Sequence, residues 1–252
     1  MRKQATFALA ACGVFAPGVF ATIVLNGSFE SPDINTNIDD GHGLYWYRRV
    51  GANTLHSWSH PGNASVMGHR PGGWEAFDGD QYAEVESGFG AFLAQSVPTT
   101  PGRRYRLTFA HAPDPLVAAG DADVRVRWEG NQVGIASATD VTTADLNWQV
   151  WQFDVIATGT SAELRFEDAL AGVPHGGGFI DAVSVVALCG PQDFDGDGDS
   201  GTDADIEAFF ACLAGNCCAT CFSGGADFNG DGDLGTDADI ESFFRVLGGG
   251  AC

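Results

Sequence analysis

An internal duplication near the C-terminus constrains this chain more than any other feature of its sequence. The segment DFDGDGDSGTDADIEAFF, residues 193–210, returns as DFNGDGDLGTDADIESFF, residues 227–244, with 15 of 18 positions identical at a spacing of 34 residues. A repeat of this kind predicts two copies of one small structural unit, neither of which can bury its apolar face alone.

Each copy begins with acidic residues at alternate positions, the pattern of a calcium-binding loop. Calcium takes six to eight oxygen ligands, which such a loop supplies from side chains at positions 1, 3 and 5 and a backbone carbonyl at position 7, with glycine at the sharp turn of position 6. The expected ligands are Asp193, Asp195, Asp197 and Asp199 in the first copy, and Asp227, Asn229, Asp231 and Asp233 in the second. We predict two Ca²⁺ sites, because so many crowded carboxylates repel one another without a cation.

The residue that closes each loop is open to more than one interpretation. Position 12, where an acid is usual, is alanine in both copies. The acids on either side of it are Asp203 and Asp205 in the first copy, and Asp237 and Asp239 in the second. One inserted residue would bring Asp205 and Asp239 to the ion, and we expect these two to close the loops. Each also lies three residues after a threonine, which is the capping-box spacing of a helix that needs no metal.

Apolar residues recur after each loop at the spacing of an amphipathic helix. They are Ile206, Phe209, Phe210 and Leu213 in the first copy, and Ile240, Phe243, Phe244 and Leu247 in the second. The pattern predicts two short helices that pack against each other with approximate twofold symmetry.

These loops and helices resemble the dockerin-like tandem repeats, of EF-hand type, that occur on secreted proteins such as those of planctomycetes. The resemblance covers residues 189–252 and implies a calcium-dependent attachment module whose partner is a cohesin-like protein. The inserted loop residue and the cysteine-rich link CLAGNCCATC between the copies depart from the family pattern.

The N-terminus indicates export from the cell. Arg2 and Lys3 precede an apolar run, and small residues favour cleavage after Ala21, so that residues 1–21 form a signal peptide. A lipoprotein with Cys12 as its lipidated residue is the alternative. No other stretch has the roughly 18 apolar residues of a transmembrane helix, so we expect a secreted, extracellular or cell-surface protein.

All cysteines other than Cys12 lie in the C-terminal segment, and behind a signal peptide they predict disulfides. The candidates are Cys189, Cys212, Cys217, Cys218, Cys221 and Cys252, whose pairing the sequence leaves open. A zinc site built from Cys217, Cys218 and Cys221 is an alternative, although no histidine follows His175.

The charge of the chain excludes some classes of partner. After removal of Arg2 and Lys3 the chain has 10 arginines and no lysine against 33 acids, which disfavours binding to nucleic acid or anionic lipid. Thirteen of the acids lie in residues 189–252, where Arg245 is the only base. The negative charge is therefore concentrated where cations are expected to bind.

Residues 22–188 alternate apolar and polar side chains between Pro- and Gly-containing turns. Strands are expected at 82–86, 92–97, 104–110, 124–128, 148–155, 162–166 and 179–186. The pattern predicts a mainly β fold, an antiparallel β-sandwich or jelly roll, followed by a small α-helical calcium-binding domain at 189–252.

Three segments of this region, VLNGSFESP, GDQYAEVESGFGAFLAQSVPTTPGRRYRLTFAHAP and FIDAVSVV, resemble the galactose-binding-like jelly rolls of many carbohydrate-binding modules. The resemblance implies a polysaccharide or glycan as partner, and one structural calcium ion that ties the first strand to the last. Glu30 and Asp181 are the positions that match this ion site.

Residues 41–78 are rich in aromatic side chains and in turn residues, and we expect them to form loops. Flat rings stack on the C–H faces of sugars, so Tyr45, Trp46, Trp58 and Trp74 are candidate glycan-binding residues. The alternative is that two or three of these rings cover the core of the sandwich.

No catalytic motif occurs in the sequence, and we do not expect an enzyme. Glu84 and Glu86 share a strand face, about 6.5 to 7 Å apart, which approaches the spacing of glycosidase carboxylates. The prediction is a non-catalytic carbohydrate-binding protein with a calcium-dependent attachment module. The alternatives are a structural or adhesion protein of the cell envelope without a soluble ligand, and a glycosidase.

Overall fold

The structure is a computed structural model, and it describes residues 22–33, 46–49, 55–60, 65–68, 74–85, 92–117, 122–137, 145–170 and 177–250. For residues 46–49 and 65–68 it describes the backbone only. The predictions for the signal peptide, Cys12, Tyr45, Glu86 and Cys252 lie outside the described residues.

The described part of the chain has ten strands followed by two helices, which confirms a mainly β fold with a small helical region at its C-terminal end. The strands are β1 (Trp46–Arg49), β2 (Ser65–Gly68), β3 (Gln81–Val85), β4 (Phe92–Pro98), β5 (Arg104–Pro113), β6 (Val124–Trp128), β7 (Asn131–Ala136), β8 (Gln149–Ile156), β9 (Ser161–Asp168) and β10 (Gly178–Ala187). The helices are α1 (Asp203–Leu213) and α2 (Asp237–Leu247).

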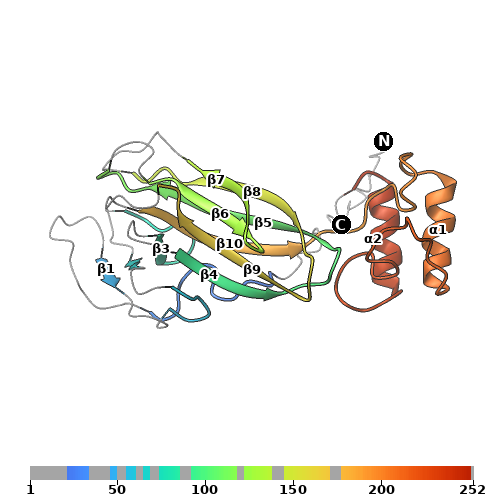
Figure 1. Cartoon of the computed structure of the whole chain (residues 1–252), viewed down its shortest axis with the longest axis horizontal. Coiled ribbons are helices and arrows are strands. Elements are labelled where there is room, and N and C mark those ends of the chain that lie inside the picture. Colours follow the sequence, from blue (N-terminus) through green and yellow to red (C-terminus); the bar gives the residue numbers. More distant parts are fainter. Residues whose placement is uncertain are drawn as a thin grey trace, which may run out of the picture.

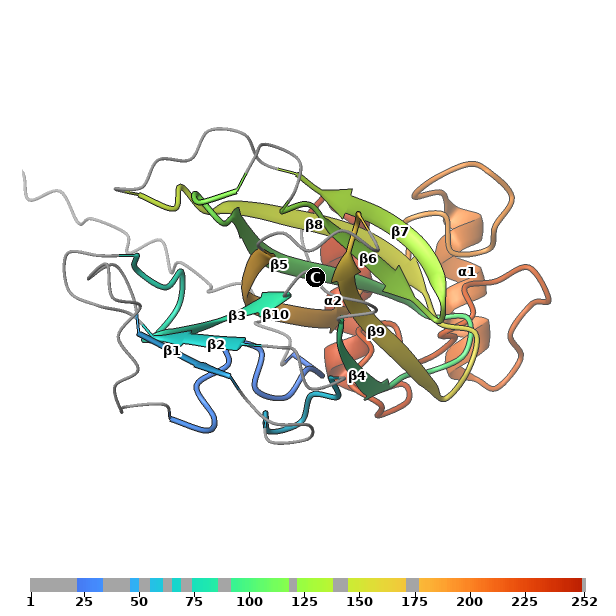
Figure 2. The same cartoon turned by 60° about the vertical axis from the view of Figure 1, so that its left-hand side comes forward.

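Two antiparallel sheets form a sandwich (Figure 1). One sheet has the strand order β1-β2-β3-β10-β5-β8, and the other has the order β4-β9-β6-β7. Figure 2 shows the short strands β1 and β2 at the edge of the larger sheet, away from the helices. The predicted antiparallel β-sandwich is therefore confirmed.

The sandwich core follows the alternation of the sequence. Tyr105, Leu107 and Phe109 on β5 are buried, and the ring of Phe109 meets that of Phe166 on β9 edge to face at a centroid distance of 4.9 Å. Contacts of this kind between the two sheets exclude water from their facing surfaces, and they supply most of the hydrophobic stabilisation.

Three strands were not expected from the sequence. β1 and β2 lie in the region that we expected to be loops, and that expectation was wrong for residues 46–49 and 65–68. Strands of four residues are too short for an alternating pattern to appear. β7 was missed because its side chains are mostly exposed or half-buried, so it lacks an apolar face.

A second apolar cluster lies on the other face of the six-stranded sheet. It consists of Trp74, Tyr82, Ala112, Leu146 and Phe179, with Ala76 and Trp148 partly buried against it. Loop residues 74–76 and 146–148 thus cover the outer side of β3, β5 and β10 instead of leaving it to solvent.

The two helices pack against each other beyond one end of the sandwich (Figure 1). Phe209 and Phe243 stack across their interface, with ring centroids 4.1 Å apart and ring planes 13° from parallel. This confirms the predicted packing of the two copies. Phe210 and Phe244, which the helical pattern also assigned to the buried stripe, are 44% and 45% exposed, because they lie at the margin of the interface.

Disulfides join Cys212 to Cys217 and Cys218 to Cys221, and Cys189 is disulfide-bonded as well. The prediction of disulfides is confirmed for these cysteines. The alternative of a zinc site is wrong, because the sulfurs of Cys217, Cys218 and Cys221 are already bonded to other sulfurs. Neither helix in the described part of the chain is long and apolar enough to cross a bilayer.

Candidate functional site

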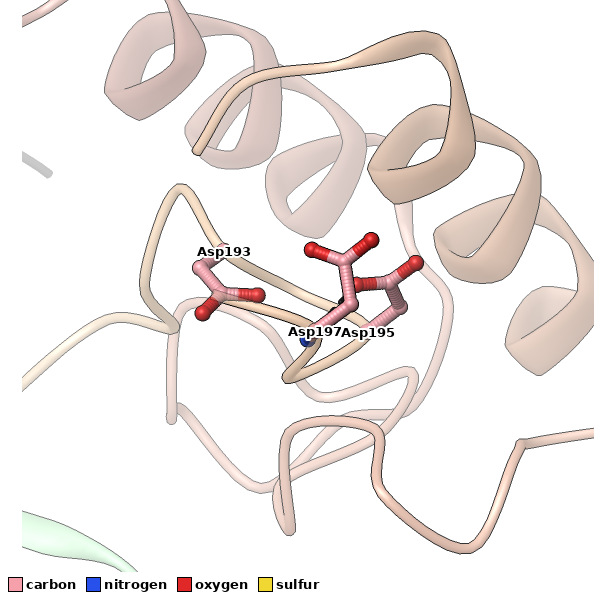
Figure 3. A group of neighbouring side chains, drawn as sticks. All are labelled: Asp193, Asp195 and Asp197. Carbon is pink, nitrogen blue, oxygen red and sulfur yellow. Dashed lines mark hydrogen bonds between the residues drawn. The ribbon is translucent and has the colours of Figure 1, made fainter. Parts of the chain in front are cut away.

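The first loop of the repeat gathers three carboxylates at one point. An oxygen from each of Asp193, Asp195 and Asp197 lies within 4.8 Å of the other two. Figure 3 shows the carboxylates of Asp195 and Asp197 side by side on one side of the loop, and that of Asp193 across from them. Local sequence alone places these groups together, since all three belong to one turn.

Backbone N–H groups hold these carboxylates in place. Asp193 accepts hydrogen bonds from Gly196 N at 2.8 Å through Oδ1 and from Gly198 N at 3.1 Å through Oδ2. Asp195 Oδ1 accepts one from Asp197 N at 3.1 Å. Gly198 has a φ of 98°, a left-handed conformation that favours glycine at the turn.

Asp205 connects this loop to the start of α1. Its side chain is fully buried, and Oδ1 accepts hydrogen bonds from Phe194 N at 2.7 Å and Asp195 N at 3.3 Å, while Oδ2 accepts from Thr202 N at 2.7 Å. Burial favours the neutral acid, but these N–H donors outweigh it and lower the pKa of Asp205. Asp203 is exposed, so of the two candidate closing acids the structure brings Asp205 to the loop.

The second loop repeats this arrangement with one change of chemistry. Oxygens of Asp227, Asp231 and Asp239 lie within 4.8 Å of one another, and Asp239 is fully buried. Asn229 takes the position of Asp195, and its Nδ2 donates to Asp231 Oδ2 at 2.8 Å. Asp237 is exposed, so Asp239 is the acid that reaches this loop.

Asp199 and Asp233, at position 7 of each loop, have exposed side chains. Their N–H groups donate to the carboxylates at position 5, with N to Oδ1 distances of 2.8 Å in the first loop and 2.9 Å in the second. Their expected role as carbonyl ligands of an ion stays a prediction.

Arg103, which precedes β5, extends from the sandwich into the second loop and was not found from the sequence. Its side chain is only 2% exposed, and Nη1 donates to Asp227 Oδ2 at 3.1 Å and to the Asp227 carbonyl at 3.3 Å. Nη2 donates to the carbonyl of Leu188 at 3.3 Å. The helical tail and the sandwich are thus joined by an ion pair that lies inside a candidate metal loop.

The pKa values of the loop acids reflect this crowding. The pKa of Asp195 is raised, first by loss of water around the carboxylate and further by the charges of neighbouring carboxylates. The pKa of Asp227 is raised mainly by burial, although the charge of Arg103 acts in the opposite direction. A cation in either loop would relieve these costs.

The residues present fit a calcium ion. Each loop offers three carboxylates within ion-binding reach of one another, and all of these donors are hard oxygens, which calcium prefers over the nitrogen and sulfur ligands of zinc. The candidate groups of three found among the described residues are these two only.

Glu30 and Asp181 lie at a turn of the sandwich. Glu30 Oε1 accepts hydrogen bonds from Asp80 N at 2.9 Å and Gln81 N at 2.8 Å, and Asp181 Oδ2 accepts from Phe77 N and Asp78 N, both at 2.9 Å. Burial raises the pKa of Asp181 to about 8 despite these donors. The two acids therefore hold the turn at 77–81, and their predicted calcium ion stays a prediction.

Two of the four candidate glycan-binding aromatics are core residues, and their assignment as sugar-stacking residues was wrong. Trp58 is 3% exposed, lies 5.3 Å from the ring of Phe29, and donates through Nε1 to Asn26 O at 3.0 Å. Trp74 is 1% exposed and packs on Phe179. The structure describes only the backbone of Trp46, which lies in β1.

A different aromatic pair is accessible on the sandwich. Phe77 is 46% exposed, and its ring meets the half-buried ring of Trp148 edge to face at 6.3 Å. Trp148 Nε1 donates to Glu75 O at 2.9 Å, which fixes the indole ring over the second apolar cluster. The sequence does not mark this pair, since 71 residues separate its members and only the fold brings them together.

Glu84, one of the two acids of the glycosidase alternative, is 8% exposed and accepts a hydrogen bond from Gly177 N at 3.3 Å. Little of this carboxylate is therefore accessible to a substrate.

No protein-family model matches the chain, and no curated protein sequence matches it. Solved structures with a partial likeness include TmCBM61 in complex with β-1,4-galactotriose (TM-score 0.37, 18% identity, 66% of this chain and 98% of that chain) and CBM35 from Paenibacillus barcinonensis (0.38, 12%, 57% and 99%). A third is the CBM22-1 xylan-binding domain of Paenibacillus barcinonensis Xyn10C (0.36, 15%, 57% and 95%). These are carbohydrate-binding modules, but superpositions this partial carry no inference about the ligand of this chain.

Proposed function

We propose that the C-terminal repeat binds two calcium ions and forms a calcium-dependent attachment module for the β-sandwich that precedes it. The single observation that supports this most is that each copy brings oxygens of three carboxylates within 4.8 Å of one another, from Asp193, Asp195 and Asp197 in the first copy and from Asp227, Asp231 and Asp239 in the second.

Calcium would supply positive charge to a tail that has 13 acids and only Arg245 as a base, and so permit its loops to close against the helices. Asp205 and Asp239 accept N–H donors from the loop and from the N-cap threonine of the helix, so each links loop closure to helix formation. Metal binding of this kind is coupled to folding, because the ligands are brought together only in the folded chain.

Calorimetric titration of the full chain with calcium tests this proposal. Two ions are expected to bind, and Asp195→Ala is expected to reduce the stoichiometry to one. Glu207→Gln is the matched control, since Glu207 is an exposed acid on α1 outside the loop. Absence of calcium uptake by the unaltered chain, or an equal loss in the control, would contradict the proposal.

The sandwich is proposed to bind polysaccharide or glycan, with the pair of Phe77 and Trp148 as the stacking surface. The observation that favours this is a half-exposed ring held rigidly beside a second one, as sugar stacking requires. The protein would then be a secreted or cell-surface carbohydrate-binding protein without catalytic activity, attached to a cohesin-like protein through its tail.

A panel of soluble polysaccharides in affinity electrophoresis tests the glycan proposal. Phe77→Ala should abolish the retardation of the protein by its ligand, while Val150→Ala, at an apolar residue on β8 that is 59% exposed, should leave it unchanged. Retardation by no polysaccharide would favour the alternative of a structural or adhesion protein.

A further inference from the structure

The two loops of the repeat differ in what holds their first acid. In the first loop, Asp193 Oδ2 accepts the N–H of Gly198 at 3.1 Å. In the second loop, the equivalent oxygen of Asp227 accepts Nη1 of Arg103, also at 3.1 Å. In the second loop, the side chain of Arg103 from the sandwich therefore donates the hydrogen bond that a backbone N–H donates in the first loop.

The arginine lies in close contact with the second loop. A Cβ atom on Gly230 would lie 1.8 Å from Arg103 Nη2, so the guanidinium packs directly against the backbone at position 4. At the same position of the first loop, a Cβ atom on Gly196 would instead lie 2.6 Å from the carbonyl of Thr220, within the turn closed by a disulfide. The two copies have thus acquired different neighbours at the same site.

The second loop is also less negatively charged than the first. The first loop directs four carboxylates inward, from Asp193, Asp195, Asp197 and Asp205. The second directs three, because position 3 is Asn229, and it also holds the positive charge of Arg103. A buried guanidinium is poorly screened by salt, so its repulsion of a nearby cation persists at physiological ionic strength.

We propose that the positive charge of Arg103 makes calcium binding in the second loop weaker than in the first. Calcium binding in the second loop is then opposed to docking of the tail on the sandwich through Arg103. This inference rests on the proposed calcium function. Because linkage is reciprocal, an ion in the second loop weakens the hold of Arg103 on Asp227 by the same factor by which Arg103 weakens ion binding. The calcium affinity of the second loop therefore depends on whether the tail is docked on the sandwich, whereas that of the first loop does not.

The test compares full-length chains in which one loop is disabled, by calorimetric calcium titration. With the first loop disabled by Asp195→Ala, the remaining site is expected to bind calcium about tenfold more weakly than the site that remains after Asp231→Ala, a difference of about 1.4 kcal/mol. This comparison leaves Arg103 intact and does not depend on the stability of an Arg103 variant.

Adding Arg103→Gln to the Asp195→Ala chain should tighten the remaining site about tenfold. Arg103→Lys keeps the charge and should leave it weak, which separates charge from packing. Arg104→Gln is the matched control, since this neighbouring arginine is exposed and pairs with Asp154 at 3.4 Å, away from the loop.

Equal affinities of the two single-loop chains would overturn the inference, and so would equal effects of Arg103→Gln and Arg103→Lys. In either case the calcium function would stand. If the unaltered chain takes up no calcium, the proposed function fails and the inference fails with it.

Discussion

Replacement of Asp205 by alanine should unfold the helical tail and leave the sandwich intact. The carboxylate is fully buried and accepts four hydrogen bonds, from Phe194 N, Asp195 N, Thr202 N and Thr202 Oγ1, at distances of 2.7, 3.3, 2.7 and 3.0 Å. Alanine provides none of them. It therefore disconnects the first loop from the start of α1.

The expected cost follows from the three backbone N–H groups that lose their acceptor. A buried donor without a partner costs about 1–3 kcal/mol; the bond from Phe194 N is buried and those from Asp195 N and Thr202 N are part-buried, so we expect about 3 kcal/mol for the three together. A single small core of this size seldom supplies more than about 3–5 kcal/mol. The change should therefore remove most of the stability of the tail.

Two optical signals separate the parts of the molecule. The helices of the described residues lie in the tail, whereas all six tryptophans precede residue 189. Urea unfolding of Asp205→Ala should show helical circular dichroism lost at a much lower urea concentration than in the unaltered chain, with the midpoint of tryptophan fluorescence unchanged.

Asp203→Ala is the control, since Asp203 is an exposed acid in the same helical turn. It should cost less than about 1 kcal/mol, the size of a charge effect at a helix N-terminus. Equal losses in the two variants, or a loss below about 1 kcal/mol in Asp205→Ala, would refute the hydrogen-bond argument.

Three further changes have expected outcomes. Phe209→Ala, at a fully buried ring stacked on Phe243, should destabilise the helices by about 3–5 kcal/mol, and Phe210→Ala, at an exposed ring, by less than about 1 kcal/mol, as measured by urea unfolding. Burial lowers the pKa of His111 from 6.5 to about 4, so the stability that its neutral form contributes is present above pH 6.5 and is lost as the pH falls towards 4. His111→Gln should remove about 3 kcal/mol of this loss of stability on acidification, as measured by urea unfolding followed by tryptophan fluorescence. An unchanged dependence of stability on pH would contradict the assignment. Loss of the Cys218–Cys221 disulfide, which closes a loop with a sequence separation of 3, should cost the tail about 2 kcal/mol, measured by urea unfolding of the double serine variant. Reduction of the unaltered chain, which also breaks Cys212–Cys217, should cost more.

Local patterns in the sequence predicted the parts of the molecule whose contacts are local. The spacing of Asp193, Asp195 and Asp197 brings them together because one turn carries all three. The alternation of Tyr105, Leu107 and Phe109 predicted a buried face because strand geometry alone decides it. In both cases the information lies within a few residues.

Contacts between distant segments were not predictable in the same way. The aromatic content of residues 41–78 suggested a sugar-binding surface, yet Trp58 and Trp74 are buried, since nothing in the local sequence says which rings the sheets and loops will cover. Arg103 followed a Pro-Gly turn and looked like any surface arginine. Its role depends on Asp227, which is 124 residues away.

The three positions at which the copies of the repeat differ support a division of roles between the loops. Leu234, in place of Ser200, is 73% exposed, and Ser242, in place of Ala208, lies on the helix, so neither alters the carboxylate groups. The third difference, Asn229, removes an acid from the loop that receives Arg103. Asn229 still offers an oxygen ligand to an ion, but it lowers the negative charge of this loop by one. Beside a buried guanidinium it leaves the second loop closer to neutral without an ion, so this loop can dock on the sandwich while the first still requires a cation to balance its charge.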